Sequence, residues 1–83
     1  MPTAYVLINC GIYHKSEVIT EISQLPGVLE SAEMGGAYDI LVKLKLGTIE
    51  ELKETIMGRL EKIHDVNSTV ALIAIEDTGR NSL

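Results

Sequence analysis

The spacing of apolar residues changes several times along this chain, and it predicts four strands. These strands cover residues 4–10, 28–34, 40–46 and 66–76. The first is an unbroken apolar run before Gly11, which is typical of a central strand with two buried faces. The second carries Glu30 and Glu33, and charge of this kind favours an edge position because it discourages unwanted pairing. The third alternates between apolar and basic side chains, which predicts one buried face.

Two stretches between the strands have the period of a helix. In residues 14–25, Val18, Ile19, Ile22 and Leu25 fall on one face, and the Pro26-Gly27 pair predicts the end of the helix. Ser16 is the expected N-cap of this helix. The second helix should begin at Thr48, where Thr48 and Glu51 have the spacing of a capping box. Its continuous apolar stripe comprises Ile49, Leu52, Ile56, Leu60 and Ile63.

The predicted order is therefore βαββαβ, and the turn after the first helix has an echo after the second. Leu25-Pro26-Gly27-Val28 recurs in character as Ile63-His64-Asp65-Val66, and each marks the end of a helix and the start of a strand. Two βαβ halves with right-handed crossovers predict a ferredoxin-like α+β fold, a split sandwich. We expect a four-stranded antiparallel sheet with both helices on one face.

The uncovered face of such a sheet predicts self-association. The first and fourth strands are apolar on both sides, so a monomer would expose a larger apolar patch than a soluble protein usually tolerates. Packing against the same face of a second copy buries the patch with two-fold symmetry. We therefore expect a homodimer at minimum, joined through this face.

The size, net charge and cysteine content of the chain limit the range of functions that it can have. Eighty-three residues form one domain, expected over residues 1–76 with a frayed tail at 77–83, and the core of so short a chain is thin. The net charge of −5 argues against direct nucleic-acid binding, which needs clustered Lys and Arg. The absence of a signal-like or membrane-spanning apolar run predicts a cytoplasmic protein without a membrane partner. Cys10 is interpreted as a small buried apolar residue.

Few residues offer catalytic chemistry. His14 and His64 are expected to be solvated residues at helix ends, and no cofactor or metal site is predicted from one cysteine and two separated histidines. The distinctive segment runs from Gly35 to Asp39. Its glycines leave backbone amides open to a carboxylate, Asp39 could face an ammonium group, and the Tyr38 ring adds a flat wall. These features suit an amino acid, but on local features alone a glycine turn capped by Asp39 is the favoured explanation.

A second candidate segment is Asn67-Ser68-Thr69, at the start of the last strand. Hydroxyl groups at the mouth of a central strand can bind the carboxylate of a ligand. They can also simply satisfy the backbone of the turn.

The order of these segments resembles the effector-binding domain, also called RAM, of the Lrp/AsnC family of transcriptional regulators. The resemblance is carried by the opening strand, by Leu25-Pro26-Gly27-Val28, by Gly36-Ala37-Tyr38-Asp39-Ile40, by Ile49-Glu50-Glu51-Leu52 and by Val66-Asn67-Ser68-Thr69. It implies dimers packed sheet against sheet as a dimeric α+β barrel, further assembly into octamers, and amino acids or related metabolites bound between dimers. The matching ligand-binding positions are Gly36, Tyr38, Asp39, Ser68 and Thr69.

Three departures from the family pattern bear on function. The helix-turn-helix that precedes this domain in the family is absent from the sequence, so we expect a module that self-assembles or associates with full-length Lrp/AsnC regulators. The segment before the first helix lacks the usual Pro-Gly, and Ala71 stands where many members have a threonine. A small dimeric enzyme of the monooxygenase type and a purely structural oligomer are the alternatives. The lack of Trp and Phe counts against the enzyme, whose pockets are usually aromatic.

Overall fold

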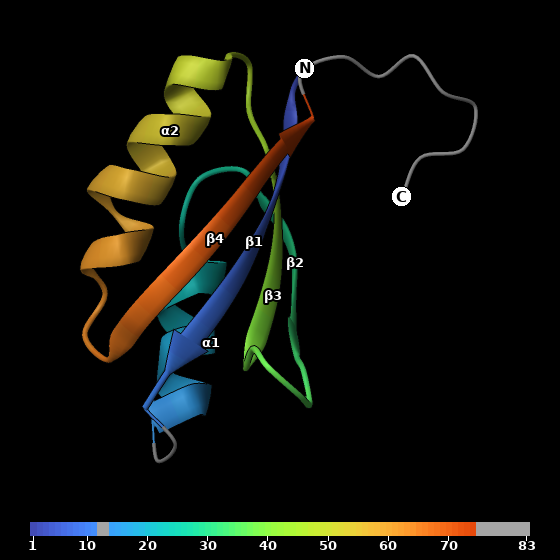
Figure 1. Ribbon diagram of the computed structural model, residues 1–83. Helices are drawn as coiled ribbons and strands as arrows, with labels where there is room; N and C mark the ends of the chain where they lie inside the picture. The colour runs from blue at the N-terminus through green and yellow to red at the C-terminus, as the bar shows by residue number, and fades with distance from the viewer. Residues whose placement is uncertain (12–13, 75–83) are drawn as a thin grey trace.

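A computed structural model describes residues 1–11 and 14–74 of the chain. Its elements are β1 (Thr3–Cys10), α1 (Lys15–Ser23), β2 (Val28–Glu33), β3 (Ile40–Lys45), α2 (Ile49–Gly58), the short 3-10 helix η2 (Leu60–Lys62) and β4 (Val66–Ala74). The strands form one antiparallel sheet in the order β2-β3-β1-β4, and both long helices lie on the same side of it (Figure 1). The predicted ferredoxin-like α+β fold is confirmed.

β1 is the strand around which the sheet is built. It pairs with β3 along one edge and with β4 along the other, as its two apolar faces predicted. Successive side chains of a strand point to opposite faces, and here every second residue of β1 is buried. Ala4, Val6, Ile8 and Cys10 face the helices, whereas the residues between them face the opposite side.

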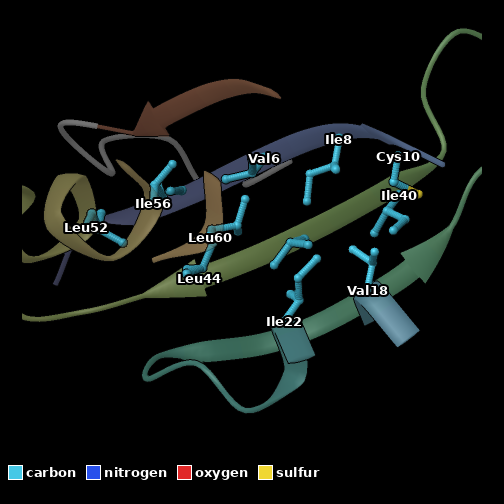
Figure 2. Packing of buried hydrophobic residues seen from close by; sticks show 12 residues of the cluster. Val6, Ile8, Cys10, Val18, Ile22, Ile40, Leu44, Leu52, Ile56 and Leu60 are labelled. Atoms are coloured by element: carbon cyan, nitrogen blue, oxygen red, sulfur yellow. The ribbon is translucent and has the colours of Figure 1, made fainter. Parts of the chain in front are cut away.

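The core is an aliphatic layer between the sheet and the helices (Figure 2). Val18 and Ile22 of α1 meet the β1 and β3 side chains at one end, while Leu52 and Ile56 of α2 meet them at the other. Leu60 of η2 is fully buried beside them. Complete burial of an aliphatic side chain contributes about 1.5–3 kcal/mol, so this layer is the main source of stability for a small domain.

The start of the first helix and the end of the second differ from the prediction, whereas Thr48 caps the second helix as predicted. The first helix begins at Lys15 with His14 at the N-cap, so the prediction of Ser16 as the N-cap is wrong. At the second helix, the Glu51 amide donates to Thr48 Oγ1 at 3.1 Å, and the Thr48 hydroxyl reaches the Glu51 carboxylate. The expected continuous second helix ends at Gly58 because glycine is a poor helix former, and η2 carries the apolar stripe onward.

The two halves of the chain repeat one turn. The Val28 amide donates to the Leu25 carbonyl at 3.4 Å, and the Val66 amide donates to the Ile63 carbonyl at 3.1 Å. The third residue of each turn has left-handed backbone, with φ 82° at Gly27 and φ 72° at Asp65. The echo in the sequence is therefore an echo in structure. The left-handed conformation costs a non-glycine residue about 1–2 kcal/mol, although Asp is among those that tolerate it best.

The position of β4 corrects one interpretation of the sequence. Its apolar character on both faces led us to place Asn67-Ser68-Thr69 at the mouth of a central strand, but β4 is an edge strand. Apolar side chains on the face directed away from the helices gave β4 the sequence pattern of a central strand. The predicted tail at residues 77–83 lies outside the described residues. Within the described part, no helix is long and apolar enough to cross a membrane.

A glycine pair tests the left-handed turn. A Cβ at Gly27 would lie 2.7 Å from Leu46 Cγ and from the Lys45 carbonyl oxygen. Gly27→Ala should therefore lower the free energy of unfolding by about 2–4 kcal/mol, from backbone strain and overpacking together. Gly35 has open space around it, so Gly35→Ala should change that energy by less than about 0.5 kcal/mol. Urea denaturation of both variants measures the difference, and equal losses would contradict this account of the turn.

Candidate functional site

The two candidate segments lie at the same end of the sheet, on either side of β1. The β2–β3 hairpin, the start of α1 and the start of β4 all gather at this end (Figure 1). The Asp39 amide donates to the Ile8 carbonyl at 2.9 Å, and Ile8 is paired on its other edge with Thr69. Two strand spacings separate the segments, roughly 10 Å. The fold therefore places them at one end of the sheet but leaves β1 between them.

Asp39 joins the hairpin to the neighbouring strand and helix. Its Oδ2 accepts a hydrogen bond from the Cys10 amide at 3.0 Å, and its Oδ1 lies 3.8 Å from Lys15 Nζ. The Asp39 carbonyl also accepts from the Met34 amide at 2.8 Å, which closes the hairpin. This carboxylate therefore has local partners, and the capping role that we weighed for it in the sequence is the one seen here.

The rest of the hairpin is open. Gly36 has φ 125°, which favours glycine, and a Cβ at Gly35 or Gly36 would meet no atom within 4 Å. The side chain of Tyr38 is partly buried beside them. The space on the side-chain side of both glycines is therefore open, as the close approach of a ligand would require.

Ser68 and Thr69 do not act together within one chain. Ser68 pairs with Asn9 on the open face of the sheet, whereas Thr69 pairs with Ile8 on the helix face. The Thr69 hydroxyl donates to Glu61 Oε2 at 2.9 Å, and the Asn9 side chain donates to Ser68 Oγ at 3.5 Å. A shallow pocket at the start of β4 is lined by Glu61, Val66, Asn67, Ser68 and Thr69. Glu61 escaped the sequence analysis because it lies in η2, where a longer helix was expected.

Both histidines are exposed residues at helix ends, as predicted, but they converge on one carboxylate, which the sequence did not indicate. His14 Nδ1 lies 2.5 Å from Asp65 Oδ2, and His64 Nε2 lies 3.7 Å from Asp65 Oδ1. The ring centroids are 6.4 Å apart. The Gly11 amide donates to the Asp65 carbonyl at 3.1 Å and brings the start of α1 to this turn. The available signal was Asp65 itself, which occupies the place of Gly27 in the echoed turn.

Cys10 lies in the hydrophobic core beside this site. Its side chain belongs to the core, where burial raises the pKa of the thiol and the nearby Asp39 carboxylate raises it further. The partner of His14 is Asp65 rather than the thiol. Among the described residues, no group of three or more His, Cys, Asp or Glu side chains is arranged to hold a metal ion.

The open face of the sheet carries a second feature of functional interest, an apolar patch. Leu7 is paired with Leu41 on one side and with Val70 on the other, and Tyr5 is paired with Leu72. Leu72 is 57% exposed and Val70 is 40% exposed. We call this set of five residues the sheet patch. Lys43 lies at its margin with its Nζ 5.8 Å from the centre of the Tyr5 ring.

Comparison with known proteins places the chain in a family of transcriptional regulators. The family model described as the Lrp/AsnC ligand-binding domain matches residues 3–82. The chain is 34% identical over 76 residues to an uncharacterized HTH-type transcriptional regulator of Pyrococcus furiosus. That match covers 87% of this chain and 50% of the relative, so the chain spans about half the length of the curated relatives it matches. The chain belongs to the Lrp/AsnC family and matches its ligand-binding domain.

Solved structures share this fold. A crystal structure of a Thermus thermophilus protein has a TM-score of 0.88 and 29% identity, covering 96% of this chain and 100% of that one. The crystal structure of a hypothetical protein from Pyrococcus horikoshii has a TM-score of 0.86 and 26% identity, covering 100% of both chains. A Neisseria meningitidis transcriptional regulator solved with L-Met shares the fold at 12% identity and a TM-score of 0.81; the match covers 98% of this chain and 54% of that one.

The buried thiol makes a testable prediction about reactivity. At pH 8 the native protein should react with a thiol reagent at least ten times more slowly than the same protein in urea, because the thiol is shielded and its raised pKa keeps the thiolate scarce. Release of thionitrobenzoate from Ellman's reagent follows the rate. Equally fast labelling in native and unfolded protein would show that Cys10 is accessible.

Proposed function

We propose that this chain is an effector-binding module that takes a small zwitterion, an amino acid, at an interface between copies of itself. In this proposal it acts through self-assembly or by association with Lrp/AsnC-type regulators. The observation that carries the proposal is the gathering of the open glycine hairpin and the β4 entry at one end of the sheet, in a chain that belongs to this family. A cytoplasmic location stays a prediction.

The sheet patch supports assembly with a second copy. It is contiguous across β3, β1 and β4, and exposed apolar surfaces of this kind usually mark an interaction site. A two-fold interface requires a surface that complements itself. The margin of the patch meets this requirement because Glu30 and Lys43 are paired neighbours on β2 and β3, so a rotated copy can set opposite charges against each other.

The two sheet edges support closure into a dimeric α+β barrel. The β2 edge is charged and carries an irregular register between Val28 and Glu30, features that protect an edge from pairing. The nine residues of β4 contain no charged residue and no proline, so its edge remains able to pair. A barrel formed by two copies would remove this exposed edge.

A site shared between copies fits the geometry of one chain. The glycine hairpin and the β4 entry are separated by β1, and the pocket at β4 is shallow, so neither encloses a ligand alone. A neighbouring copy would complete the enclosure, either in the dimer or in a larger assembly such as an octamer. In this arrangement Gly36 supplies amides for the ligand carboxylate, Tyr38 a flat wall, and Asp39, Ser68 and Thr69 polar contacts. L-Met in the Neisseria meningitidis relative supports an amino acid as ligand class.

Lrp/AsnC-type regulators are the proposed partners of this chain because the chain matches about half the length of related HTH-type regulators. Contacts through the shared domain would allow mixed assemblies in which this chain changes the regulator's response. The Thermus thermophilus and Pyrococcus horikoshii structures, whose chains are covered completely by this fold, support a role for the domain as a unit. The monooxygenase-type alternative gains no support from these relatives.

Assembly can be tested with two equally exposed apolar residues. Leu72 lies in the sheet patch, whereas Met57, 61% exposed, lies on α2. Light scattering at micromolar concentration should give at least twice the chain mass of 9.1 kDa. Leu72→Glu should weaken self-association at least tenfold because it buries a charge, while Met57→Glu should leave it unchanged. A wild-type monomer, or equal behaviour of the two variants, would contradict the proposed interface.

Ligand binding is tested first by a thermal-shift screen of the twenty amino acids, since a ligand that binds only the native state raises the melting temperature. For the ligand found, Asp39→Ala should weaken binding about ten- to hundredfold by calorimetry, the range expected for a charge-assisted contact. Asp39→Asn keeps an acceptor for the Cys10 amide and separates loss of charge from loss of the hairpin.

The glycines provide the matched control for the site. Both have open space, but only Gly36 is proposed to supply amides for the ligand carboxylate, so Gly36→Val should weaken binding more than Gly35→Val. Variants are compared only after their melting temperature and assembly match the wild type. Unchanged affinity in well-folded Asp39→Ala and Gly36→Val would place the ligand elsewhere. Failure of all twenty amino acids to bind at millimolar concentration would leave assembly alone as the function.

A further inference from the structure

The turn before β4 contains an aspartate where the matching turn in the first half contains a glycine. Asp65 and Gly27 have the same left-handed backbone and the same turn hydrogen bond. Glycine adopts this conformation freely, whereas aspartate adopts it at a cost. Strained residues of this kind persist where the surrounding structure requires the side chain, and they cluster at functional sites. The surrounding structure should therefore make contacts that require the side chain of Asp65.

The contacts of that side chain supply the reason. Its Oδ2 is out of contact with solvent, and no described residue donates a well-directed hydrogen bond to it. The approach of His14 Nδ1 is therefore mainly electrostatic, and His64 stands beside the second oxygen. A carboxylate oxygen shielded from water needs a hydrogen-bond donor or a nearby positive charge, and the two imidazoles supply the positive charge only when they bind a proton.

We propose that His14, Asp65 and His64 form a proton-sensitive clasp between the start of α1 and the turn that opens β4, and that the clasp is tightest when an imidazole is protonated. An imidazole attracts a neighbouring carboxylate more strongly when the ring carries a proton, so we expect the clasp to weaken when that proton is lost. One carboxylate between two rings suits a single shared positive charge, because two charged rings at this separation repel each other.

The other charged groups near the clasp either oppose or favour a positive charge on the His14 ring. Lys15 follows His14 in the chain, and its positive charge opposes a positive charge on His14. Lys15 is, however, paired with Asp39. The N-terminus of α1 also opposes positive charge on its N-cap residue, His14. Asp65 and Asp39 favour it, while the Cys10 thiol is uncharged below its raised pKa and adds no charge. The Asp65 carboxylate is the charged group in direct contact with the His14 ring, so the attraction between them should be stronger when the ring is charged than when it is neutral.

The clasp lies between the two candidate ligand segments. The consecutive residues His14 and Lys15 reach Asp65 on the β4 side and Asp39 on the hairpin side. Adjacent amides of Cys10 and Gly11 bond to the same two aspartates. A change of charge at His14 therefore acts where the start of α1 contacts both segments. Regulation of ligand binding by pH would follow, and only this consequence depends on the proposed function.

A double-mutant cycle without ligand tests the clasp. Wild type, His14→Gln, Asp65→Asn and the double variant are unfolded with urea at pH 5.5 and pH 8, at one protein concentration because assembly shifts stability. We expect the unfolding equilibrium constants to reveal a coupling of about two- to fivefold at pH 5.5, the range for a partly exposed ion pair. The coupling should be smaller at pH 8, where a neutral ring can offer only an uncharged donor, and it should shrink in 1 M salt.

Controls keep the result decisive. Asp65→Asn retains a residue that tolerates left-handed backbone, and Asp65→Gly copies the turn of the first half if the asparagine variant does not fold. His64→Gln should lower the pH sensitivity less than His14→Gln, because its ring is farther from Asp65 and is 91% exposed. Coupling that is equal at both pH values, or absent at pH 5.5, would overturn the clasp. Neither result would bear on amino-acid binding, which is measured separately.

Discussion

The pairing of β1 along both of its edges is the constraint on which the rest of the structure depends. Both edges of β1 are paired, and its successive side chains alternate between two surfaces, the helix layer and the open face. The helix layer is completed within the chain by α1 and α2. None of the described residues covers the open face in this way, and its apolar side chains are the physical reason to expect a second copy.

The sequence predicted the elements well where hydrophobic period was unambiguous. β1, β3 and the apolar stripes of both helices follow directly from spacing, and the helix-ending turns follow from the repeated four-residue pattern. The predictions were wrong where the spacing of apolar residues does not distinguish between two arrangements. Apolar content could not distinguish an edge strand with an uncovered face from a central strand, as β4 shows. A residue count could not show that Ser68 and Thr69, adjacent in the chain, face opposite sides of the sheet.

The candidate site was predicted in part for the same reason. The Gly36–Asp39 segment could be found because glycine, aromatic and acidic residues are adjacent in sequence. The cluster at Asp65 could not, since His14 and His64 lie in different halves of the chain and meet only through the sheet. The role of Asp39 was open in the sequence because a carboxylate that caps a turn and one that meets a ligand have the same local pattern. The Cys10 amide and Lys15 are the partners that reveal its local role.

The double pairing of β1 also limits how domains of this kind can change over evolutionary time. Exchange of one aliphatic side chain for another at Val6 or Ile8 alters packing locally. Insertion of a residue in mid-strand would instead turn every later side chain to the opposite face and break alignment with two neighbours at once. The irregular pairings lie toward strand ends, between Asn9 and Cys10 and between Val28 and Glu30. Length variation among descendants should therefore accumulate at these ends and in the hairpin, while the middle of the sheet varies in composition alone.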